Sequence, residues 1–196
     1  RETEVGIVIK KYANKKLEAG QLIALHGEAG YQADTLSPGW QMGYWPWQYT
    51  VTRVPMVVIP QGEIGLVVAN AGSPIPAGHM LGKYVDSNNY QDARAFLEEG
   101  GEKGRQLSIL TAGTYRINTA LFTIITRQNA DRHGMEPDSL LVYYMEPDKV
   151  GIVTTLDGEP IEQGEIAGPL VKGHDNFQDA QAFLSNGGRR GLQEQV

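Results

Sequence analysis

The chain has 196 residues, of which 41% are hydrophobic, so its composition is that of a globular protein long enough to bury a sizeable core. Its formal net charge is −6, and it lacks the basic surplus with which proteins neutralise phosphates, which argues against nucleic acid as a partner. Cysteine is absent, which excludes disulfides, thiolate metal ligands and a cysteine nucleophile.

The first predicted element is a strand at residues 5–10, because this segment is short and rich in Val and Ile. Four lysines follow closely around Tyr12, namely Lys10, Lys11, Lys15 and Lys16. Such a run is usually a solvated loop, but near an anionic lipid surface each lysine contributes about 1 kcal/mol to binding. A solvated loop and a membrane contact both stay open for this run.

All three tryptophans of the chain lie in one short segment, with two tyrosines beside them: Trp40, Tyr44, Trp45, Trp47 and Tyr49. Tryptophan and tyrosine are favoured at membrane interfaces and protein contacts, because one edge of each side chain is polar and the rest is apolar. Two interpretations stay open. The segment is either a β-hairpin whose alternate aromatic side chains fill the core between units, or an exposed contact patch for a membrane or a partner.

Further strands are predicted by the same Val- and Ile-rich pattern at residues 64–69, 106–110, 115–118, 121–127, 140–145 and 150–155. The most apolar stretch, residues 54–72, is interrupted by two prolines, a glutamate and several glycines. No stretch of the sequence therefore reaches the roughly 18 to 20 apolar residues that a membrane-spanning helix needs.

Two similar phrases, QDARAFLEEGGEKGRQ at 91–106 and QDAQAFLSNGGRRGLQ at 178–193, each predict a short amphipathic helix followed by a glycine turn. Apolar residues fall at helical spacing on one face of each helix: Tyr90, Ala93, Phe96 and Leu97 in the first, and Phe177, Ala180, Phe183 and Leu184 in the second. We expect Asn88 or Asn89 to cap the first helix, and Gly100 and Gly187 to take left-handed conformations after the helices.

A longer pattern repeats three times along the chain. A strand-like phrase has its glycine at Gly6, Gly65 and Gly151, and a G-x-x-G-x-Q motif follows each phrase, beginning at Gly27, Gly101 and Gly188. The glycines of the motif free the backbone for a positive φ or a close approach, and we expect its glutamine to bond backbone groups of a neighbouring strand. The motif lacks the Lys-Ser/Thr of a phosphate-binding loop, so it predicts a structural turn.

The repeats predict three consecutive units: residues 1–58, a β unit with the tryptophans, then residues 59–145 and 146–196. Small repeats of this kind stack on their neighbours, because none buries its apolar face alone. The expected fold class is α+β, with tandem small β-rich units and a short covering helix in the second and third. The third unit stops where the second continues, so we expect the native chain to continue beyond it.

The sequence predicts no catalytic residues, no metal and no cofactor. The four histidines, which we interpret as exposed loop residues, lack metal-site spacing: His26, His79, His133 and His174. The one Gly-Ser pair precedes a proline, so there is no nucleophile elbow, and the acidic residues are scattered. Two M-E-P-D segments, beginning at Met135 and Met145, predict turns and not calcium loops.

The phrases YQDARAFLEEGGEKGRQLSILTAGTYRINTALF and FQDAQAFLSNGGRRGLQ resemble the signature stretch of bacterial flotillin-like proteins. These belong to the SPFH or band 7 family, with stomatin, prohibitin, flotillin and the HflK/HflC pair. The resemblance covers most of the chain and is strongest over residues 60–125 and 150–193. Its motifs are specific because a helix, a double glycine, G-x-x-G-x-Q and G-T-Y-R-I-N occur in that order.

The resemblance implies SPFH-type units and a non-enzymatic, membrane-associated scaffold on the cytoplasmic face of a membrane. Such a protein forms homo-oligomers and organises membrane microdomains and other membrane proteins. The family's membrane anchor and heptad-rich coiled coil are not found in this sequence. Because the chain opens on Arg1 instead of Met, we expect that a preceding segment, including the membrane attachment, has been removed.

Three alternatives to the scaffold stay open. One is a β module that binds a small ligand or a peptide through the aromatic cluster. Another is a vault-like shell protein, built from tandem β units of related design. The third is an enzyme whose residues converge only in space.

Overall fold

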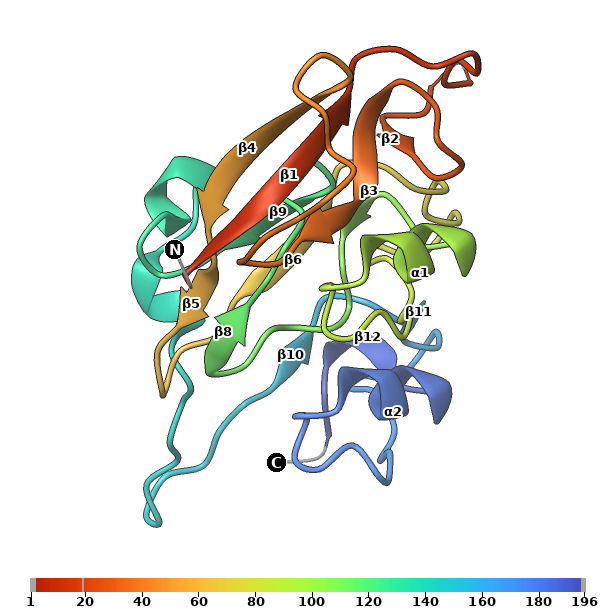
Figure 1. The fold of residues 1–196 in the computed structure, drawn as a ribbon. Coiled ribbons are helices and arrows are strands. Elements are labelled where there is room, and N and C mark those ends of the chain that lie inside the picture. Colours follow the sequence, from red (N-terminus) through yellow and green to blue (C-terminus); the bar gives the residue numbers. More distant parts are fainter. Residues whose placement is uncertain (1–2, 19, 195–196) are drawn as a thin grey trace.

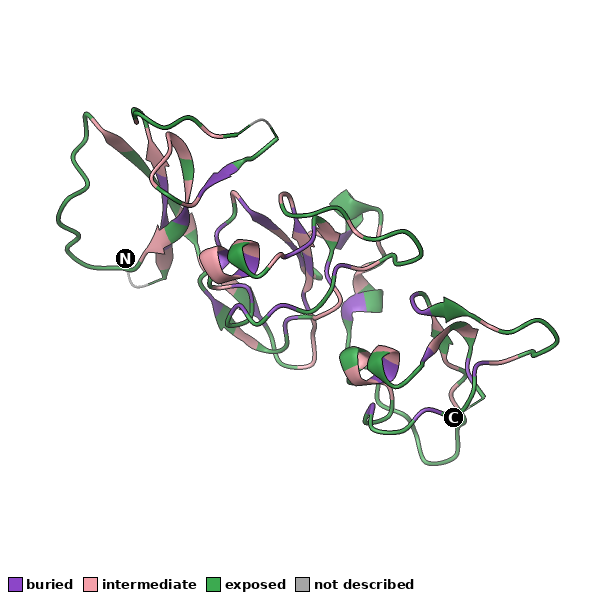
Figure 2. Ribbon diagram, turned by 90° about the vertical axis from the view of Figure 1, so that its right-hand side faces the viewer, coloured by how far each residue is buried: buried purple, intermediate pink, exposed green. Residues whose placement is uncertain are grey.

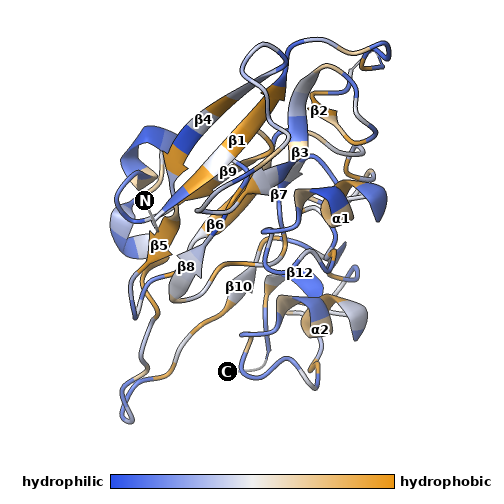
Figure 3. Cartoon of the chain, viewed as in Figure 1, coloured by the Kyte–Doolittle hydropathy of each residue, from blue (hydrophilic) through white to orange (hydrophobic). Residues whose placement is uncertain are grey.

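The structure is a computed structural model that describes residues 3–18 and 20–194. Short strands and two short helices give a mixed α+β fold, as predicted. The elements form three groups that follow one another in a row from the N-terminal to the C-terminal side (Figure 2). Hydrophobic residues concentrate on the strands, for example β1 and β5, while part of α1 is strongly hydrophilic (Figure 3).

The first group is a four-stranded sheet in the order β2-β3-β1-β4 (Figure 1). Its strands are β1 (Glu4–Lys10), β2 (Ile23–Ala24), β3 (Gly30–Leu36) and β4 (Tyr49–Pro55). The central strand β1 pairs antiparallel with both β3 and β4. It buries Val5, Ile7 and Val8, so the apolar residues that predicted this strand are the ones that hold it in place.

The second group holds the main core. Its strands are β5 (Val57–Ile59), β6 (Leu66–Ala69), β7 (Gly104–Arg105), β8 (Gly113–Tyr115) and β9 (Phe122–Ile125). β6 lies between β7 and β9, and β5 pairs with β8. Helix α1 (Ala93–Glu98) covers them with Phe96, whose ring packs edge-on against Phe122 at 5.0 Å between centroids. Two 3-10 helices, η1 (Ala130–His133) and η2 (Pro137–Leu140), complete the group.

The third group repeats part of the second. It contains β10 (Thr154–Thr155), β11 (Glu159–Pro160), α2 (Ala180–Ser185) and β12 (Arg189–Leu192). The sheet order is β10-β12-β11. Phe183 of α2 is 4% exposed and Phe96 of α1 is 0% exposed, so the two predicted helices bury equivalent residues.

One turn geometry recurs in all three groups. The second glycine of each G-x-x-G-x-Q motif has a φ of 125°, 125° and 118°, at Gly30, Gly104 and Gly191 respectively. In the strand pairing these glycines lie opposite Lys10, Ala69 and Thr155 respectively. Each of these three partners comes four residues after the glycine of its strand phrase, which is Gly6, Gly65 or Gly151. The three segments therefore share the same pairing register, which the sequence repeat predicts.

The glutamine of the motif acts differently from the prediction. In each copy its side-chain amide donates to two carbonyl oxygens of its own turn, those four and two residues earlier. For Gln106 these are the oxygens of Glu102 and Gly104, at 2.7 and 2.8 Å. The expected bond to the backbone of a neighbouring strand is wrong, because the turn folds back onto the side chain and leaves its own carbonyls within reach.

The start of each helix also differs from the prediction. Asp92 caps α1 and Asp179 caps α2, each accepting a hydrogen bond from the amide three residues later. The expected caps, Asn88 and Asn89, lie in a left-handed turn with Tyr90, with φ values of 52°, 52° and 60°. Asparagine tolerates this conformation better than most residues, which accounts for its presence there. The glycines after the helices are left-handed as predicted, with φ of 75° at Gly100 and 87° at Gly187.

Several predicted strands are shorter or missing. The segment 140–145 forms no strand. Its first residue, Leu140, is the last residue of η2, and its second, Leu141, makes only an isolated bridge with Glu63. The segment 150–155 is a strand only at its last two residues. The segment 106–110 makes isolated bridges at its two ends, and the strand expected at 115–118 ends at Tyr115.

Candidate functional site

The two unusual segments of the sequence meet at one end of the first sheet. Lys10, the last residue of β1, pairs with Tyr49, the first residue of β4. The lysine-rich loop leaves β1 at the point where the tryptophan-rich loop enters β4 (Figure 1). We call residues 10–16 and 44–49 together the basic-aromatic tip. Trp40 lies outside it, because β3 ends at Leu36 opposite Gly6, away from Lys10, and Gln41 still bonds the Ser37 oxygen there.

Hydrogen bonds join the two loops of the tip. The Lys11 amide donates to the Gln48 oxygen at 2.8 Å, and its ammonium group donates to the Pro46 oxygen at 2.7 Å. The ammonium group of Lys10 donates to the Gly27 oxygen at 2.7 Å, while Lys15 and Lys16 are exposed. Two of the predicted lysines thus help to build the tip, and two extend into solvent.

The aromatic side chains of the tip are exposed. Trp47 is 69% exposed and Trp45 55%, and Trp40, which lies outside the tip, is 101% exposed. Trp45 and Trp47 stack on each other with centroids 5.2 Å apart and planes 11° apart, while Tyr44 packs edge-on against Tyr49. The interpretation of a hairpin that fills the core is wrong. The Trp45 oxygen accepts bonds from the amides of residues 48 and 49, so the chain turns here and the stacked rings stay exposed.

The tip carries positive charge on an acidic protein. Residues 10–17 hold four lysines and no acidic residue, and residues 37–48 hold no charged residue. Because the chain has a formal charge of −6 with these four lysines included, the rest of it carries −10. This asymmetry orients the molecule, since an anionic surface attracts the tip and repels the remainder.

Glu28 lies at the base of the tip, where its surroundings favour the ionised form of its carboxyl group. Its carboxylate accepts a hydrogen bond from the His26 amide at 2.8 Å. Hydrogen bonds from the backbone amides of Glu28 itself and of His26 lower the pKa of this carboxyl, and the nearby charges of His26 and Lys15 lower it further.

A shallow hollow opens between the two loops. It has a volume of about 310 Å³ and is lined by Lys10, Tyr12, Ala13, Asn14 and Gln48. A phenol, two side-chain amides and a lysine around one space offer hydrogen bonds and a positive charge to a small polar ligand.

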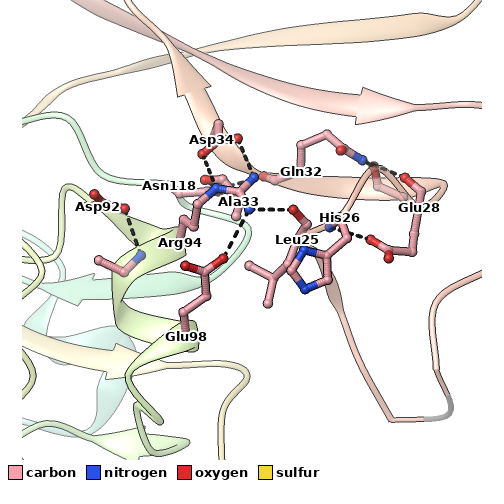
Figure 4. A network of polar contacts seen from close by, with 12 residues as sticks. Leu25, His26, Glu28, Gln32, Ala33, Asp34, Asp92, Arg94, Glu98 and Asn118 are labelled. Atoms are coloured by element: carbon pink, nitrogen blue, oxygen red, sulfur yellow. Dashed lines mark hydrogen bonds and ion pairs between the residues drawn. The ribbon is translucent and has the colours of Figure 1, made fainter.

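A polar network fixes the first group on the second (Figure 4). The Arg94 guanidinium of α1 makes an ion pair with Asp34 of β3 at 2.7 Å and donates to the Leu25 oxygen. The hydrogen bond to Asp34 raises the pKa of Arg94. The Asn118 amide donates to the oxygens of Gln32 and Ala33, at 3.0 and 2.8 Å. Sequence reasoning missed this network, because its partners lie about sixty residues or more apart and carry no spacing signal.

The histidines do not form a site. His26, His79 and His133 are exposed, as expected. His174 is only 2% exposed, so the expectation of an exposed loop residue is wrong for it. Its Nδ1 accepts a bond from the Phe177 amide at 2.7 Å and its Nε2 lies 2.9 Å from the Val171 oxygen, so the ring is held inside the left-handed turn before α2. Among the described residues, no group of histidines and acidic residues could hold a metal ion.

Comparison with known protein families, with curated proteins and with solved structures finds no match to this chain. Within the part of the chain that the structure describes, no helix is long and apolar enough to cross a membrane.

Proposed function

We propose that this chain is the head region of a non-enzymatic, membrane-associated scaffold, built from tandem SPFH-type units. The basic-aromatic tip contacts the headgroup region of an anionic membrane. The observation that carries the proposal is that four lysines and two stacked, exposed tryptophans, Trp45 and Trp47, separate in the sequence, lie together at one end of the first sheet. The resemblance of the helix and glycine-turn phrases to flotillin-like proteins supports the same conclusion.

The physical reason is that the two kinds of side chain act on different parts of a bilayer. Exposed Trp and Tyr rings insert at the headgroup level, because they are apolar with one polar edge. Each lysine near an anionic leaflet adds about 1 kcal/mol, and this attraction falls off within a Debye length. Because Lys10 and Lys11 already bond backbone oxygens, we expect Lys15 and Lys16 to contribute more.

The contact by itself is weak. Four lysines and one or two interfacial rings give a few kcal/mol at most, from which the cost of orienting the protein must be subtracted. Attachment through a further membrane segment and assembly with copies of itself raise the effective concentration and make such contacts sufficient. The expected partners are therefore other copies of this chain and membrane proteins, at the cytoplasmic face, where anionic lipids concentrate.

The test is flotation of the protein with liposomes of phosphatidylcholine alone and of phosphatidylcholine with phosphatidylserine. We expect weak, salt-sensitive binding to the anionic liposomes alone. Lys15→Gln with Lys16→Gln should reduce it, and so should Trp45→Ala with Trp47→Ala, because they remove the charge and the inserted rings respectively.

Matched controls come from the other end of the molecule. Lys149→Gln with Lys172→Gln removes the same charge outside the tip and should leave flotation unchanged. Tight binding that salt does not weaken would contradict the proposal of a weak tip contact. Equal loss in the control pair would show that total charge, and not the tip, drives binding.

The hollow at the tip favours a second candidate, a module that binds a small polar ligand or a peptide. The two candidates differ in what the hollow residues do. Asn14→Leu fills the hollow with an apolar side chain and keeps every lysine and tryptophan. Liposome binding should survive this change if the tip contacts lipid, whereas a ligand held in the hollow would be displaced.

A further inference from the structure

The equivalent strands of the three repeats, β1, β6 and β10, differ in how many neighbouring strands they have. β1 lies between β3 and β4, and β6 lies between β7 and β9. Among the described strands, β10 pairs with β12 alone. The second edge of β10 and of the residues just before it, from Val150 onward, is therefore open.

The segment before β10 corresponds closely to the segment before β6. In the second group a turn closes with the Glu63 amide on the Pro60 oxygen at 3.2 Å. In the third group the equivalent turn closes with the Lys149 amide on the Glu146 oxygen at 3.1 Å. The glycine after each turn faces one apolar side chain, since a Cβ on Gly65 would collide with Ile59 and a Cβ on Gly151 with Met145.

This correspondence matches four exposed residues of the third group with four covered ones of the second. Met145 is 50% exposed, and its counterpart Ile59 is 3% exposed. Tyr143, Val150 and Ile152 are 78%, 78% and 80% exposed. Their counterparts Val57, Ile64 and Leu66 are all half-buried. We call Tyr143, Met145, Val150 and Ile152 the acceptor edge.

Two further strands, β8 and β9, cover the counterpart residues in the second group. β8 pairs with β5 along Val57 to Ile59, and β9 pairs with β6 from Leu66 to Ala69. Ile125 of β9 also packs with Leu66 in a small core closed by η1 and η2. In the third group no described residue takes the place of either strand, and the segment projects away from the body as an extended loop (Figure 1).

We propose that the acceptor edge binds a pair of extended polypeptide segments with the chemistry of β8 and β9. One segment, of the Gly-Thr-Tyr type, pairs antiparallel with residues 143–145. The other, of the Phe-Thr-Ile-Ile type, pairs antiparallel with residues 152–155, in the register that joins Leu66 to Ile125 in the second group. The unpaired backbone groups of an open edge supply the hydrogen bonds, and the apolar side chains supply the burial.

The chain's own β8 and β9 are occupied by β5 and β6, so the partner is a separate segment of this pattern. The inference does not depend on the membrane contact, because the acceptor edge belongs to the third group and the basic-aromatic tip to the first. A negative result for peptide binding would therefore not contradict the proposed membrane contact, and a negative flotation result would not contradict the proposed acceptor edge.

The experiment adds a synthetic peptide with the sequence of residues 111–141 to the full chain and follows amide hydrogen exchange. We expect saturable protection, at least about tenfold slower exchange, across residues 143–145 and 150–155. Residues 66–69, whose edges are already paired, should not change. A peptide with Ile124→Pro lacks an amide donor in the second strand and should not protect.

Two variants of the chain locate the contact. Ile152→Asp places a charge on the acceptor edge and should abolish protection by the peptide. Ile166→Asp changes an isoleucine that is 87% exposed elsewhere in the same group and should leave protection intact.

Absence of saturable protection by the original peptide would overturn the proposal, and so would any of three further results. The peptide with Ile124→Pro could protect as well as the original, or Ile166→Asp could abolish protection as fully as Ile152→Asp. The third is a chain that sediments as a dimer, with residues 150–155 protected without peptide, since two copies would then pair edge to edge.

Discussion

At the scale of single residues, Tyr90 combines an unfavourable positive φ with the burial of a polar phenol. It has a φ of 60° and is only 4% exposed, and its ring packs against Phe122 with centroids 5.4 Å apart. A bulky residue rarely adopts a positive φ, because its Cβ crowds the following carbonyl. Burial of the ring under α1 is what holds it in this conformation.

The burial of Tyr90 predicts how stability depends on pH. Desolvation raises the pKa of its phenol to about 12, although the hydroxyl donates to the Ser108 oxygen at 3.2 Å. In the unfolded chain the phenol ionises near pH 10, so its stabilising effect is complete below pH 10 and is lost between about 10 and 12. Between about pH 10 and 12 the free energy of unfolding, measured with urea, should fall in both proteins. The fall should be up to about 3 kcal/mol larger in the original protein than in Tyr90→Phe, which has no phenol to ionise. If stability fell equally with pH in the two proteins, the loss could not be attributed to ionisation of Tyr90.

At the scale of elements, the two helices are held by their phenylalanines. Phe96 is fully buried against Tyr90 and Phe122, so Phe96→Ala should lower the free energy of unfolding by about 3 to 5 kcal/mol. Phe183→Ala, at the equivalent place, should cost less, since its ring neighbours are His174 and Phe177 outside the main core. Denaturant unfolding measures both, and a loss under about 1 kcal/mol for Phe96→Ala would show that α1 is not held by its core face.

The helices and glycine turns could be predicted from the sequence because their determinants are local. Apolar spacing sets the buried face of α1, and Gly100 ends it with a left-handed residue. The cap could not be chosen correctly among neighbouring Asn and Asp residues, since all of them accept hydrogen bonds from amides. The left-handed turn of Asn88 and Asn89 moved the start of the helix to Asp92.

Strands were predicted less well because they need partners. Residues 150–153 have the same apolar pattern as residues 64–67. Residues 66–69 nevertheless have strands on both sides and form a strand of four residues, whereas in the third group only residues 154–155 form a strand. For the same reason the sequence could name the lysines and tryptophans of the tip but could not decide whether the rings were buried. That outcome depended on a turn at Trp45 and on which loop lay beside it.

At the scale of the whole molecule, neighbouring groups of strands are joined by polar side chains. At each junction a side chain of the later group bonds backbone atoms of the group before it. The Asn118 amide reaches two oxygens of β3 across the first junction. At the second junction the carboxylate of Asp157 accepts bonds from the amides of Met80 and Leu81, at 3.3 and 3.1 Å. Both side chains are buried, so each junction is a polar contact shielded from water.

The first junction can be tested with Asn118→Ala. Asn118 is 0% exposed, and its loss would leave two backbone oxygens of β3 without their donor, at a cost of about 1 to 3 kcal/mol. We expect amide exchange to accelerate in residues 23–36 of the first group more than in residues 66–69 of the second, because the first sheet loses an anchor while the core under α1 stays intact. Asn70→Ala is the matched control, since the Asn70 amide bonds Thr123 within the second group and makes no contact across the junction. If Asn118→Ala accelerated exchange equally in both groups, this side chain would stabilise the second group itself, and the orientation of the tip would depend on Arg94 and Asp34 instead.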